Sequence, residues 1–348
     1  MKIALITYYY SSNNGAVMQT YALCRYLKEL GHDVTLIDVR QDESANQPFY
    51  VKLLKYFIFG YRINKIIQKH YPKLTRRYSS IKELQEDPPE ADYYIVGSDQ
   101  TWNPDISKDL MMAFFLDFGD NRVRRMSYAS SFGVSEWPIS DESVTKRIKQ
   151  LLHSYSAVSV REEQGKTICE KTFEISPQVV LDPTFLNEQY EEFNKGTKEK
   201  NLFLCYKLNR TADFWENTCK VGEIIGIKPT NLNYNYPKQG FRYCFPPSLR
   251  TWMRKFAEAK FVLTDSFHGV AFSIINRKQF VAILNEDGKN SRLLNLMKVM
   301  GLEDRIYPTV ASMLEDQKWK QKIDYSKIEP IIKSNIELSR EYLINALK

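Results

Sequence analysis

Histidines and cysteines are few in this sequence, and it lacks the segments that mark membrane-spanning or secreted proteins. Its five cysteines are scattered, form no CxxC pair and are odd in number, which predicts neither a zinc site nor a disulfide framework. No apolar run reaches the length of about 20 residues that a membrane-spanning helix needs. The opening MKIALITYYY leads into polar SSNNG, which predicts a buried strand, not a signal peptide. These absences predict a soluble, cytoplasmic protein.

Acidic residues are missing from one long basic stretch. Between Ser44 and Lys82 the chain has no Asp or Glu, but it has nine basic residues, namely Lys52, Lys55, Arg62, Lys65, Lys69, Lys73, Arg76, Arg77 and Lys82. Basic side chains of 51–69 favour one helical face and Leu54 and Phe57 the other. One interpretation is a helix that lies on an anionic membrane surface. The other is a helix packed on its domain with a solvated basic face.

Apolar strand patterns alternate with amphipathic helix patterns along the chain. At the start, KIALITYY, GAVMQTYALCRYLKEL and HDVTLIDV predict a βαβ unit. The chain has 348 residues, of which 43% are hydrophobic, and this is enough for two cores. Apolar strands separated by helices predict parallel sheets that are covered on both faces. We therefore predict an α/β fold with two Rossmann-like domains, which resembles the GT-B architecture with its cleft between domains.

A charged segment, NEQYEEFNKGTKEKN, predicts the boundary between the domains. We predict an N-terminal α/β domain at 1–186, which includes the basic insertion at 44–82, and a linker at 187–200. The C-terminal α/β domain is predicted at 201–348 and ends in a long helix.

The segment FVLTDSFHGVAFSII places His268, one of only four histidines, where a strand pattern gives way to a helix pattern. Asp265 or Ser266 can cap that helix, whose free N–H groups and dipole favour an anion. Gly269 would let a ligand approach the backbone closely. The structural alternative is a capping turn with a buried, hydrogen-bonded imidazole.

A second motif, YIVGSDQTWN, joins an apolar strand to a dense set of hydrogen-bonding side chains. Asp99, Gln100 and Asn103 can pair with sugar hydroxyls, and Trp102 can cover the apolar face of a sugar. These residues therefore suit a polyhydroxylated ligand. The structural alternative is an Asx-type turn with Trp102 in the core.

Two further motifs place a charged residue at the end of a strand. In SVREE, Arg161 can clamp a phosphate or carboxylate through two parallel hydrogen bonds, and the alternative is an ion pair with a neighbouring acid. In VVLDPTF, Asp182 is followed by Pro183, which fits either a structural turn or a catalytic acid. Both motifs place charge where parallel sheets bind ligands.

The loop SSNNG before the first predicted helix is another candidate contact. Asn14 and Gly15 could approach a ligand with their backbone amides. Only one glycine is present, so the loop is not the GxGxxG fingerprint of dinucleotide binding, and a nicotinamide cofactor is disfavoured.

In order along the chain, these motifs resemble those of the polysaccharide pyruvyl transferase family. The resemblance is carried by ITYYYSSNNGAVMQTYAL, IVGSDQTWN, SYASSFG, VSVREEQG, VVLDPTF and TDSFHGVAFSI. It implies a GT-B-like enzyme that moves a pyruvyl group from phosphoenolpyruvate onto two hydroxyls of a sugar. Phosphate is released, and a cyclic ketal of a capsule or exopolysaccharide is formed. Phosphoenolpyruvate is then a donor substrate, and neither a cofactor nor a metal is expected.

The resemblance also implies residue roles. It makes His268 the essential histidine and Arg161 the phosphate-binding arginine. Many relatives have an arginine where this chain has Ser266, so Lys207 or Arg210 is expected to take over part of the anion binding. The predicted site comprises His268, Asp99 and Asp182 for acid–base catalysis; Arg161, Ser266, Gly269, Asn14, Gly15 and Lys207 for the donor; and Gln100, Trp102 and Asn103 for the acceptor.

Two other functions fit a two-domain fold with sugar-binding residues. One is a GT-B glycosyltransferase that uses a nucleotide sugar, although we find no decisive signature of a base-binding pocket. The other is a non-catalytic glycan-binding protein. The expected partners are phosphoenolpyruvate and a sugar acceptor, which is either lipid-linked or soluble, and binding of nucleic acid is not expected. Peripheral contact with the inner face of the membrane would run through 51–69.

Overall fold

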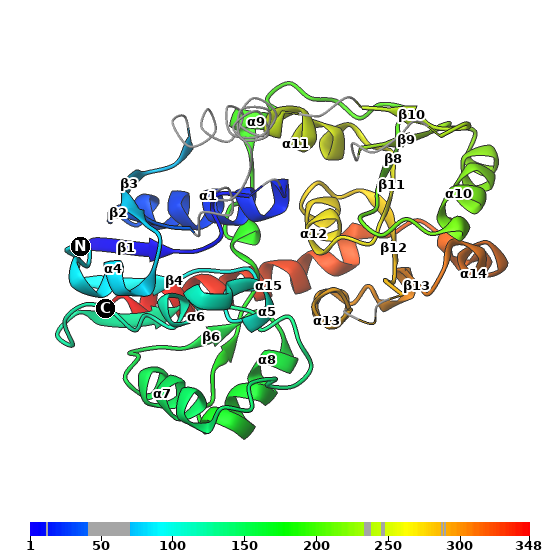
Figure 1. The fold of residues 1–348 in the computed structure, drawn as a ribbon. Helices are drawn as coiled ribbons and strands as arrows, with labels where there is room; N and C mark the ends of the chain where they lie inside the picture. The colour runs from blue at the N-terminus through cyan, green and yellow to red at the C-terminus, as the bar shows by residue number, and fades with distance from the viewer. Residues whose placement is uncertain (12, 41–69, 233–237, 245–247, 287, 289) are drawn as a thin grey trace, which may run out of the picture. The chain divides into compact units, whose positions relative to one another are not determined.

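The chain folds into two compact units in a computed structural model that describes residues 1–11, 13–40, 70–232, 238–244, 248–286, 288 and 290–348 (Figure 1). Unit 1 comprises Met1–Asn187 and Ile336–Lys348, and unit 2 comprises Glu188–Asn335. The helix proposed at 51–69 lies outside the described residues, as does most of the basic insertion at 44–82.

Unit 1 is built on a parallel sheet. Its strands and helices are β1 (Lys2–Ile6), α1 (Asn14–Glu29), β2 (Asp33–Val39), β3 (Lys73–Tyr78), α4 (Ile81–Glu86), β4 (Tyr93–Val96), α5 (Pro104–Ser107), α6 (Met111–Phe114), β5 (Arg124–Ser127), α7 (Glu142–His153), β6 (Ser159–Val160), α8 (Glu163–Ile168) and β7 (Gln178–Val179). The strand order is β3-β2-β1-β4-β5, and all these pairs are parallel. Parallel bridges from Met126 to Ala157 and from Ser130 to Val160 continue the sheet to β6, which pairs with β7.

Local sequence explains how the first βαβ unit forms. In β1 the last four of five residues are buried, because the strand KIALI lies in the middle of the sheet. Helix α1 begins where the Asn13 side chain accepts a hydrogen bond from the Gly15 N–H at 2.9 Å. It ends before Gly31, whose φ of 85° is one that glycine adopts without strain. The predicted βαβ unit is therefore present.

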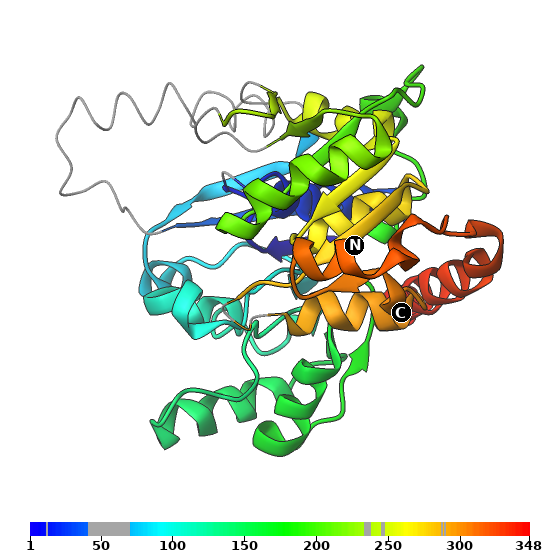
Figure 2. The ribbon, with the colours of Figure 1, turned by 90° about the vertical axis from the view of Figure 1, so that its right-hand side faces the viewer.

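Unit 2 contains a second parallel sheet (Figure 2). Its strands and helices are α9 (Glu191–Asn194), β8 (Phe203–Tyr206), α10 (Ala212–Ile225), β9 (Pro229–Asn231), β10 (Arg242–Tyr243), α11 (Leu249–Glu258), β11 (Phe261–Thr264), α12 (Phe267–Ile275), β12 (Gln279–Ile283), α13 (Ser291–Val299), β13 (Ile306–Tyr307) and α14 (Val310–Glu315). The strand order is β10-β9-β8-β11-β12-β13. The α/β fold with two parallel sheets is confirmed.

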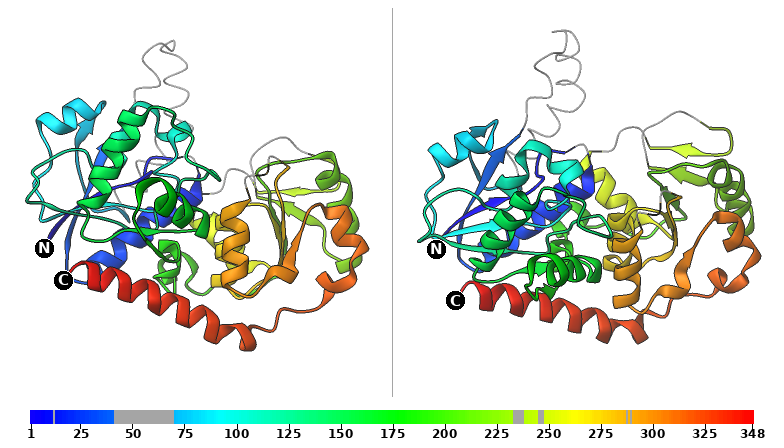
Figure 3. Two further views of the ribbon diagram at one scale, coloured as in Figure 1. Left: turned by 90° about the horizontal axis from the view of Figure 1, so that it is seen from below. Right: turned by 60° about the horizontal axis from the view of Figure 1, so that its bottom comes forward.

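The last helix, α15 (Tyr325–Ala346), begins in unit 2 and ends in unit 1 (Figure 3). In unit 1 the Tyr342 hydroxyl donates to the Ser127 carbonyl at 2.9 Å, and the Ser339 hydroxyl accepts from the Leu181 N–H at 2.9 Å. The prediction that placed all of 201–348 in the second domain is corrected for Ile336–Lys348, which belong to unit 1. Its apolar periodicity predicted a helix but carried no information on the sheet against which the helix packs.

The parallel strands of each unit all end at one edge of its sheet. In unit 1 that carboxyl edge carries the segments after β1, β2, β4, β5 and β6. In unit 2 it carries the segments after β8 and β11, which are neighbouring strands. The topology thus brings motifs that are distant in sequence to one edge within each unit.

Candidate functional sites at the two sheet edges

Arg161 lies at the carboxyl edge of unit 1 among three acids, and these four residues are named the Arg161 cluster. Its Nη1 donates to Asp182 Oδ2 at 2.7 Å. Its Nη2 lies 3.6 Å from Asp99 Oδ1, and its Nε lies 4.0 Å from Glu162 Oε2. The Arg161 side chain is only 1% exposed. The ion pair that the sequence left open as the alternative is present.

The carboxylates keep this buried guanidinium charged. Burial by itself lowers the pKa of Arg161, but the charges of Asp182, Asp99 and Glu162 more than offset burial and raise the pKa above its ordinary value. A buried ion pair of this kind needs additional hydrogen bonds on its carboxylates. Glu162 has one, because its Oε1 accepts from the Ser131 hydroxyl at 2.8 Å.

Asp182 uses both of its oxygens within the protein. Oδ2 accepts from the Ser98 hydroxyl at 3.0 Å in addition to Arg161. Oδ1 accepts from the N–H of Thr184 at 3.0 Å and from its hydroxyl at 2.8 Å. The side chain is fully buried, so it is not placed to accept a proton from a substrate. Asp182 thus forms the structural turn that the sequence left open as an alternative, and its catalytic role stays a prediction that this burial does not favour.

Asp99 is the most exposed carboxylate of the Arg161 cluster, with 14% of its side chain accessible. Its φ of 76° lies in the left-handed region, which is uncommon for residues other than glycine. The turn is held because the Asp99 carbonyl accepts from the N–H groups of Thr101 at 2.8 Å and Ser131 at 3.0 Å. Asp99 is thus a fixed carboxylate that solvent reaches.

Trp102 does not face solvent. It is fully buried, its Nε1 donates to the Phe114 carbonyl at 3.0 Å, and its ring stacks on Phe115 with centroids 5.3 Å apart. The apolar faces of the indole are therefore used in the core. The predicted contact between Trp102 and the acceptor is therefore corrected. Trp102 lies in the core, which is the alternative that the sequence left open.

Gln100 and Asn103 are bonded to each other. Asn103 Nδ2 donates to Gln100 Oε1 at 2.9 Å, and Asn103 Oδ1 caps α5 by accepting from the Asp105 N–H at 3.0 Å. Gly133, from the SYASSFG motif, makes room for this pair, because a Cβ at that position would collide with Gln100 Oε1. Gln100 is partly exposed, whereas Asn103 is buried. An acceptor contact therefore stays a prediction for Gln100.

The loop before α1 offers less to a ligand than the sequence indicated. The Gly15 N–H donates to its own cap, Asn13, and Gly15 is buried. Asn14 is partly exposed at the first position of the helix. The predicted contact through the Gly15 amide is corrected because that amide is already hydrogen-bonded, while Asn14 stays a prediction.

In unit 2 the equivalent edge is built around Asp265, and Asp265, Lys207, Arg210 and His268 are named the Asp265 cluster. Asp265 Oδ1 accepts from the Leu208 N–H at 2.6 Å, and Oδ2 accepts from the Asn209 N–H at 2.8 Å. Lys207 Nζ lies 3.3 Å from Asp265 Oδ2, and the side chains of both residues are buried. Asp265 therefore fixes the loop after β8 and does not cap α12.

Arg210 follows Lys207 on the same loop. Its Nε donates to the Lys207 carbonyl at 3.3 Å. Burial lowers the pKa of Arg210, and the charge of Asp265 partly opposes this shift. The loop after β8 thus carries two cations beside one buried carboxylate, which suits an anion.

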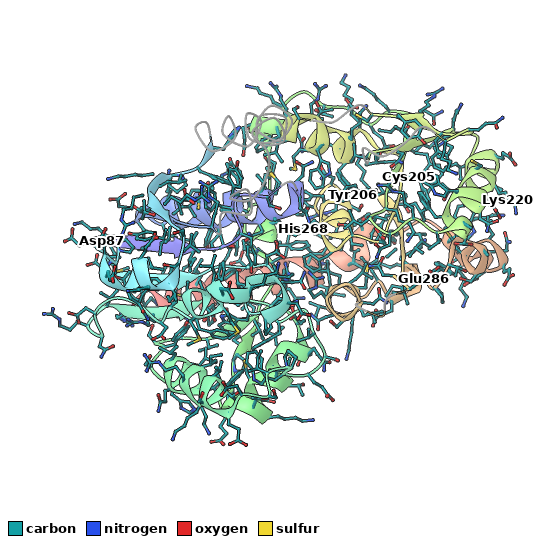
Figure 4. The ribbon with its side chains drawn as sticks, viewed as in Figure 1. Asp87, Cys205, Tyr206, Lys220, His268 and Glu286 are labelled. Carbon is teal, nitrogen blue, oxygen red and sulfur yellow. The ribbon has the colours of Figure 1, made fainter. Side chains whose placement is uncertain are left out.

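Helix α12 begins at the same edge, next to the end of β8 (Figure 4). Ser266 caps it by accepting from the Gly269 N–H at 3.4 Å, which confirms one of the two caps expected. His268 is the second helical residue and is 5% exposed, with its ring edge-on to Phe267 at 5.3 Å. His268 therefore lies in the first turn, as predicted.

Gly269 has a different role from the one that its sequence position suggested. A Cβ there would collide with Thr264 Oγ1 and lie 3.1 Å from Tyr206 Cδ1. That hydroxyl is fixed, because it donates to the Tyr206 carbonyl at 2.5 Å and accepts from the Ser266 N–H at 3.1 Å. The group that lies close to Gly269 is thus Thr264 of strand β11. This corrects the prediction that Gly269 lets a ligand approach the backbone.

Sequence reasoning did not assign Ser98, Ser131, Glu162 or Gly133 to a site. All four stand in the quoted motifs, immediately after strand patterns, which is the signal that could have identified them. Ser98 bonds to Asp182 and Ser131 bonds to Glu162, which follow other strands, so these contacts depend on the strand order.

The described residues also bear on metal binding and on membrane crossing. Within these residues, no group of three or more His, Cys, Asp or Glu side chains could hold a metal ion. Of the helices that these residues form, none combines the length and hydrophobicity that crossing a bilayer requires.

Solved structures with a similar architecture show which fold this chain has. UDP-GlcNAc 2-epimerase from Neisseria meningitidis, bound to UDP-GlcNAc, has a TM-score of 0.58 at 10% identity and covers 99% of this chain and 100% of its own. AviGT4, a glycosyltransferase involved in avilamycin A biosynthesis, has a TM-score of 0.55 at 9% identity, with 99% and 97% covered. The glycosyltransferase of kitacinnamycin has a TM-score of 0.53 at 10% identity, with the same coverage. The chain therefore has the GT-B-like fold of glycosyltransferases and epimerases.

Within that fold, the family is shown by sequence. The family model for polysaccharide pyruvyl transferase matches residues 13–287, which is more than half of the chain. This chain belongs to the polysaccharide pyruvyl transferase family, a family of transferases. A comparison with curated proteins finds no match.

Proposed function

We propose that this protein transfers a pyruvyl group from phosphoenolpyruvate to two hydroxyls of a sugar and forms a cyclic ketal. Membership of the family supports the reaction class. The observation that carries the proposal is the charge difference between the two sheet edges. In unit 2 Lys207 contacts the single buried acid, Asp265, and Arg210 lies on the same loop, whereas unit 1 has three acids around one cation.

The donor in this proposal binds unit 2. Phosphoenolpyruvate carries a phosphate and a carboxylate, so it needs cations and N–H donors. Lys207 and Arg210 lie on the loop after β8. Helix α12 follows β11, which is the strand next to β8, so the first turn of α12 lies at the same edge of the sheet. Helix N-termini favour anions because their first N–H groups have no partner within the helix. These groups replace the arginine that many relatives have at the position of Ser266.

His268 serves as the acid in this proposal. It donates a proton to the methylene carbon of phosphoenolpyruvate, while a sugar hydroxyl oxygen bonds to the adjacent carbon. The bond from that carbon to the phosphate oxygen then breaks, and the second hydroxyl oxygen takes its place. Of the two hydroxyl protons, one restores His268 and the other leaves on phosphate. Histidine suits this work because it gains and loses a proton near neutral pH.

Asp99, in unit 1, takes the proton of the attacking hydroxyl and passes it to the departing phosphate, so that Asp99 ends the reaction ionised. It is a fixed carboxylate that solvent reaches, and Arg161 lies 3.6 Å from it. Arg161 and Asp182 enter the proposal as positioning residues, because both side chains are buried. Direct contact between Arg161 and the donor stays a prediction.

The test is release of phosphate from phosphoenolpyruvate in the presence of galactose-, mannose- and glucosamine-type glycosides. We expect release to depend on one class of glycoside and to yield a pyruvyl ketal in equal amount, identified by mass spectrometry. A thermal-shift series separates the alternatives: stabilisation by phosphoenolpyruvate supports the proposal. Stabilisation by uridine or guanosine diphosphate favours a nucleotide-sugar glycosyltransferase, and stabilisation by glycoside alone favours a non-catalytic binding protein.

The cellular setting follows from the same proposal. Phosphoenolpyruvate is a cytoplasmic metabolite, so a cytoplasmic enzyme that modifies units of a capsule or exopolysaccharide fits the chemistry. A lipid-linked acceptor at the inner face of the membrane would fit the basic sequence at 51–69. Co-sedimentation with anionic liposomes, compared at low and high salt, tests that contact.

A further inference from the structure

An exposed tyrosine stands beside an anchored arginine at the carboxyl edge of unit 1. Tyr10 is 37% exposed, although its neighbour Tyr9 is buried. The guanidinium carbon of Arg40 lies 4.0 Å from the centroid of the Tyr10 ring, which is a cation–π contact. Tyr10, Arg40 and the Asp38 that holds Arg40 are named the Tyr10 platform.

Asp38 fixes the position of the arginine. Arg40 Nε donates to Asp38 Oδ1 at 2.6 Å, and Nη2 donates to Oδ2 at 2.7 Å. This two-bond pair is geometrically specific, and the Asp38 side chain is only 8% exposed. The pair uses two of the three guanidinium nitrogens, and Nη1 is not part of it. The ring and the guanidinium are thus held in place before any ligand arrives.

The platform lies at the same edge as Asp99. Tyr10 follows β1 and Arg40 follows β2, whereas Asp99 follows β4, and the strand order is β2-β1-β4. The ends of β1 and β4 touch, because the Thr7 hydroxyl donates to the Ser98 carbonyl at 2.9 Å. Neighbouring strands are about 4.8 Å apart, so the three segments span about 10 Å, which is the size of one or two sugar rings.

We infer that the Tyr10 platform binds the acceptor sugar by stacking, a role that the buried Trp102 is not placed to fill. This inference rests on the proposed function and adds the residues that select its acceptor. A pyranose offers an apolar C–H face to an aromatic ring and hydroxyls to donors such as Arg40 Nη1. Because Asp38 neutralises Arg40, the chemistry suits an uncharged pyranoside rather than an acidic sugar.

The experiment compares Tyr10→Ala, Tyr10→Phe and Ile344→Ala with the wild type. Ile344 is the matched control, since it is also 37% exposed and belongs to unit 1. We expect Tyr10→Ala to raise the KM for the methyl galactoside, mannoside or N-acetylglucosaminide that the wild type uses by about tenfold. The KM for phosphoenolpyruvate should not change. Tyr10→Phe, which keeps the ring, and Ile344→Ala should both match the wild type.

Binding of the same methyl glycosides without donor separates this inference from the proposed function. Saturation-transfer NMR should show binding to the wild type and to Tyr10→Phe, and a loss of signal in Tyr10→Ala. If the wild type binds glycoside in this way but releases no phosphate from phosphoenolpyruvate, the inference stands and the proposed function fails. If Tyr10→Ala binds glycoside as the wild type does, the inference is overturned whatever the activity. Absence of binding to the wild type across the three glycosides also overturns it.

A second variant tests the guanidinium without removing the charge. Arg40→Lys keeps the cation but loses the two-bond pair with Asp38. We expect weaker glycoside binding, an unchanged thermal shift with phosphoenolpyruvate and an unchanged circular dichroism spectrum. Unchanged glycoside binding in this variant would remove Arg40 from the platform.

Discussion

The Arg161 cluster of unit 1 and the Asp265 cluster of unit 2 occupy the same place in their folds but have opposite charge. Each lies at the carboxyl edge of a parallel sheet, next to the start of a helix. In unit 1 one arginine faces three carboxylates, and in unit 2 one carboxylate faces a lysine, with an arginine on the same loop. The same architecture can therefore present either charge at the edge where ligands bind.

The difference between the clusters lies in how each buried charge is compensated. Arg161 depends on side chains from other strands, since Asp99 follows β4 and Asp182 follows β7. Asp265 depends mostly on backbone N–H groups of the loop after β8, with Lys207 as a longer contact. We conclude that the Arg161 cluster is sensitive to substitution of one side chain, whereas the Asp265 cluster is partly protected by its backbone.

The largest expected effect is on stability when Arg161 is removed. Arg161→Ala leaves buried carboxylates uncompensated and should lower the free energy of unfolding by about 3–5 kcal/mol. Urea unfolding measures this. Arg122→Ala is the matched control, because it breaks an exposed arginine–aspartate pair at 2.6 Å and should leave the free energy of unfolding nearly unchanged. Equal losses in the two variants would contradict the central role of Arg161.

The second effect is on turnover, in the Asp265 cluster. His268→Ala should lower the rate of phosphate release from phosphoenolpyruvate by about 10²-fold or more, because the proposed acid is lost. His153→Ala is the control, since His153 lies in unit 1 and contacts the Phe173 carbonyl at 2.9 Å. A His268→Ala protein that is folded and turns over at the wild-type rate would exclude His268 as the acid.

The third effect tests the close packing of α12 on β11. Gly269→Ala should lower the free energy of unfolding by about 1–3 kcal/mol, because the new Cβ collides with the Thr264 hydroxyl. In the double variant with Thr264→Ala the two losses should not add, which a double-mutant cycle measures. Strict additivity would mean that the two groups do not meet.

The smallest effect concerns pH and a buried carboxylate of unit 2 outside the Asp265 cluster. Burial alone raises the pKa of Glu258, but Lys200 and Lys255 more than offset it, so the pKa lies below its ordinary value of 4.5. The ionised Glu258 therefore stabilises the fold fully above pH 4.5 and less as pH falls through the lowered pKa. Glu258→Gln should lower stability at pH 7 by about 0.2–1 kcal/mol, with the difference shrinking on acidification. A difference that grows in acid would reverse the sign of the pKa shift.

Much of the fold could be predicted from the sequence because its strands are short apolar runs separated by helix patterns. The βαβ start, both parallel sheets and the cap of α12 by Ser266 follow from local pattern and capping chemistry. That the end of α15 belongs to unit 1 could not be predicted, because helical periodicity does not show which sheet the apolar face of the helix packs against. The same limit applies to Trp102, whose aromatic face fits a sugar and a core equally well until its neighbours are known.

By itself, the sequence determined that charged and polar residues end the strands, since strand ends can be recognised from hydrophobicity. It also determined the family, because the motifs occur in a fixed order. Only the tertiary structure decided which of those residues meet. Arg161 and Asp182 are 21 residues apart and pair at 2.7 Å, and Tyr10 and Arg40 meet because β1 and β2 are neighbours. Hydrogen bonds and charge interactions act over a few ångströms, so the strand order decides whether a polar residue is a partner in the core or a group left for a ligand.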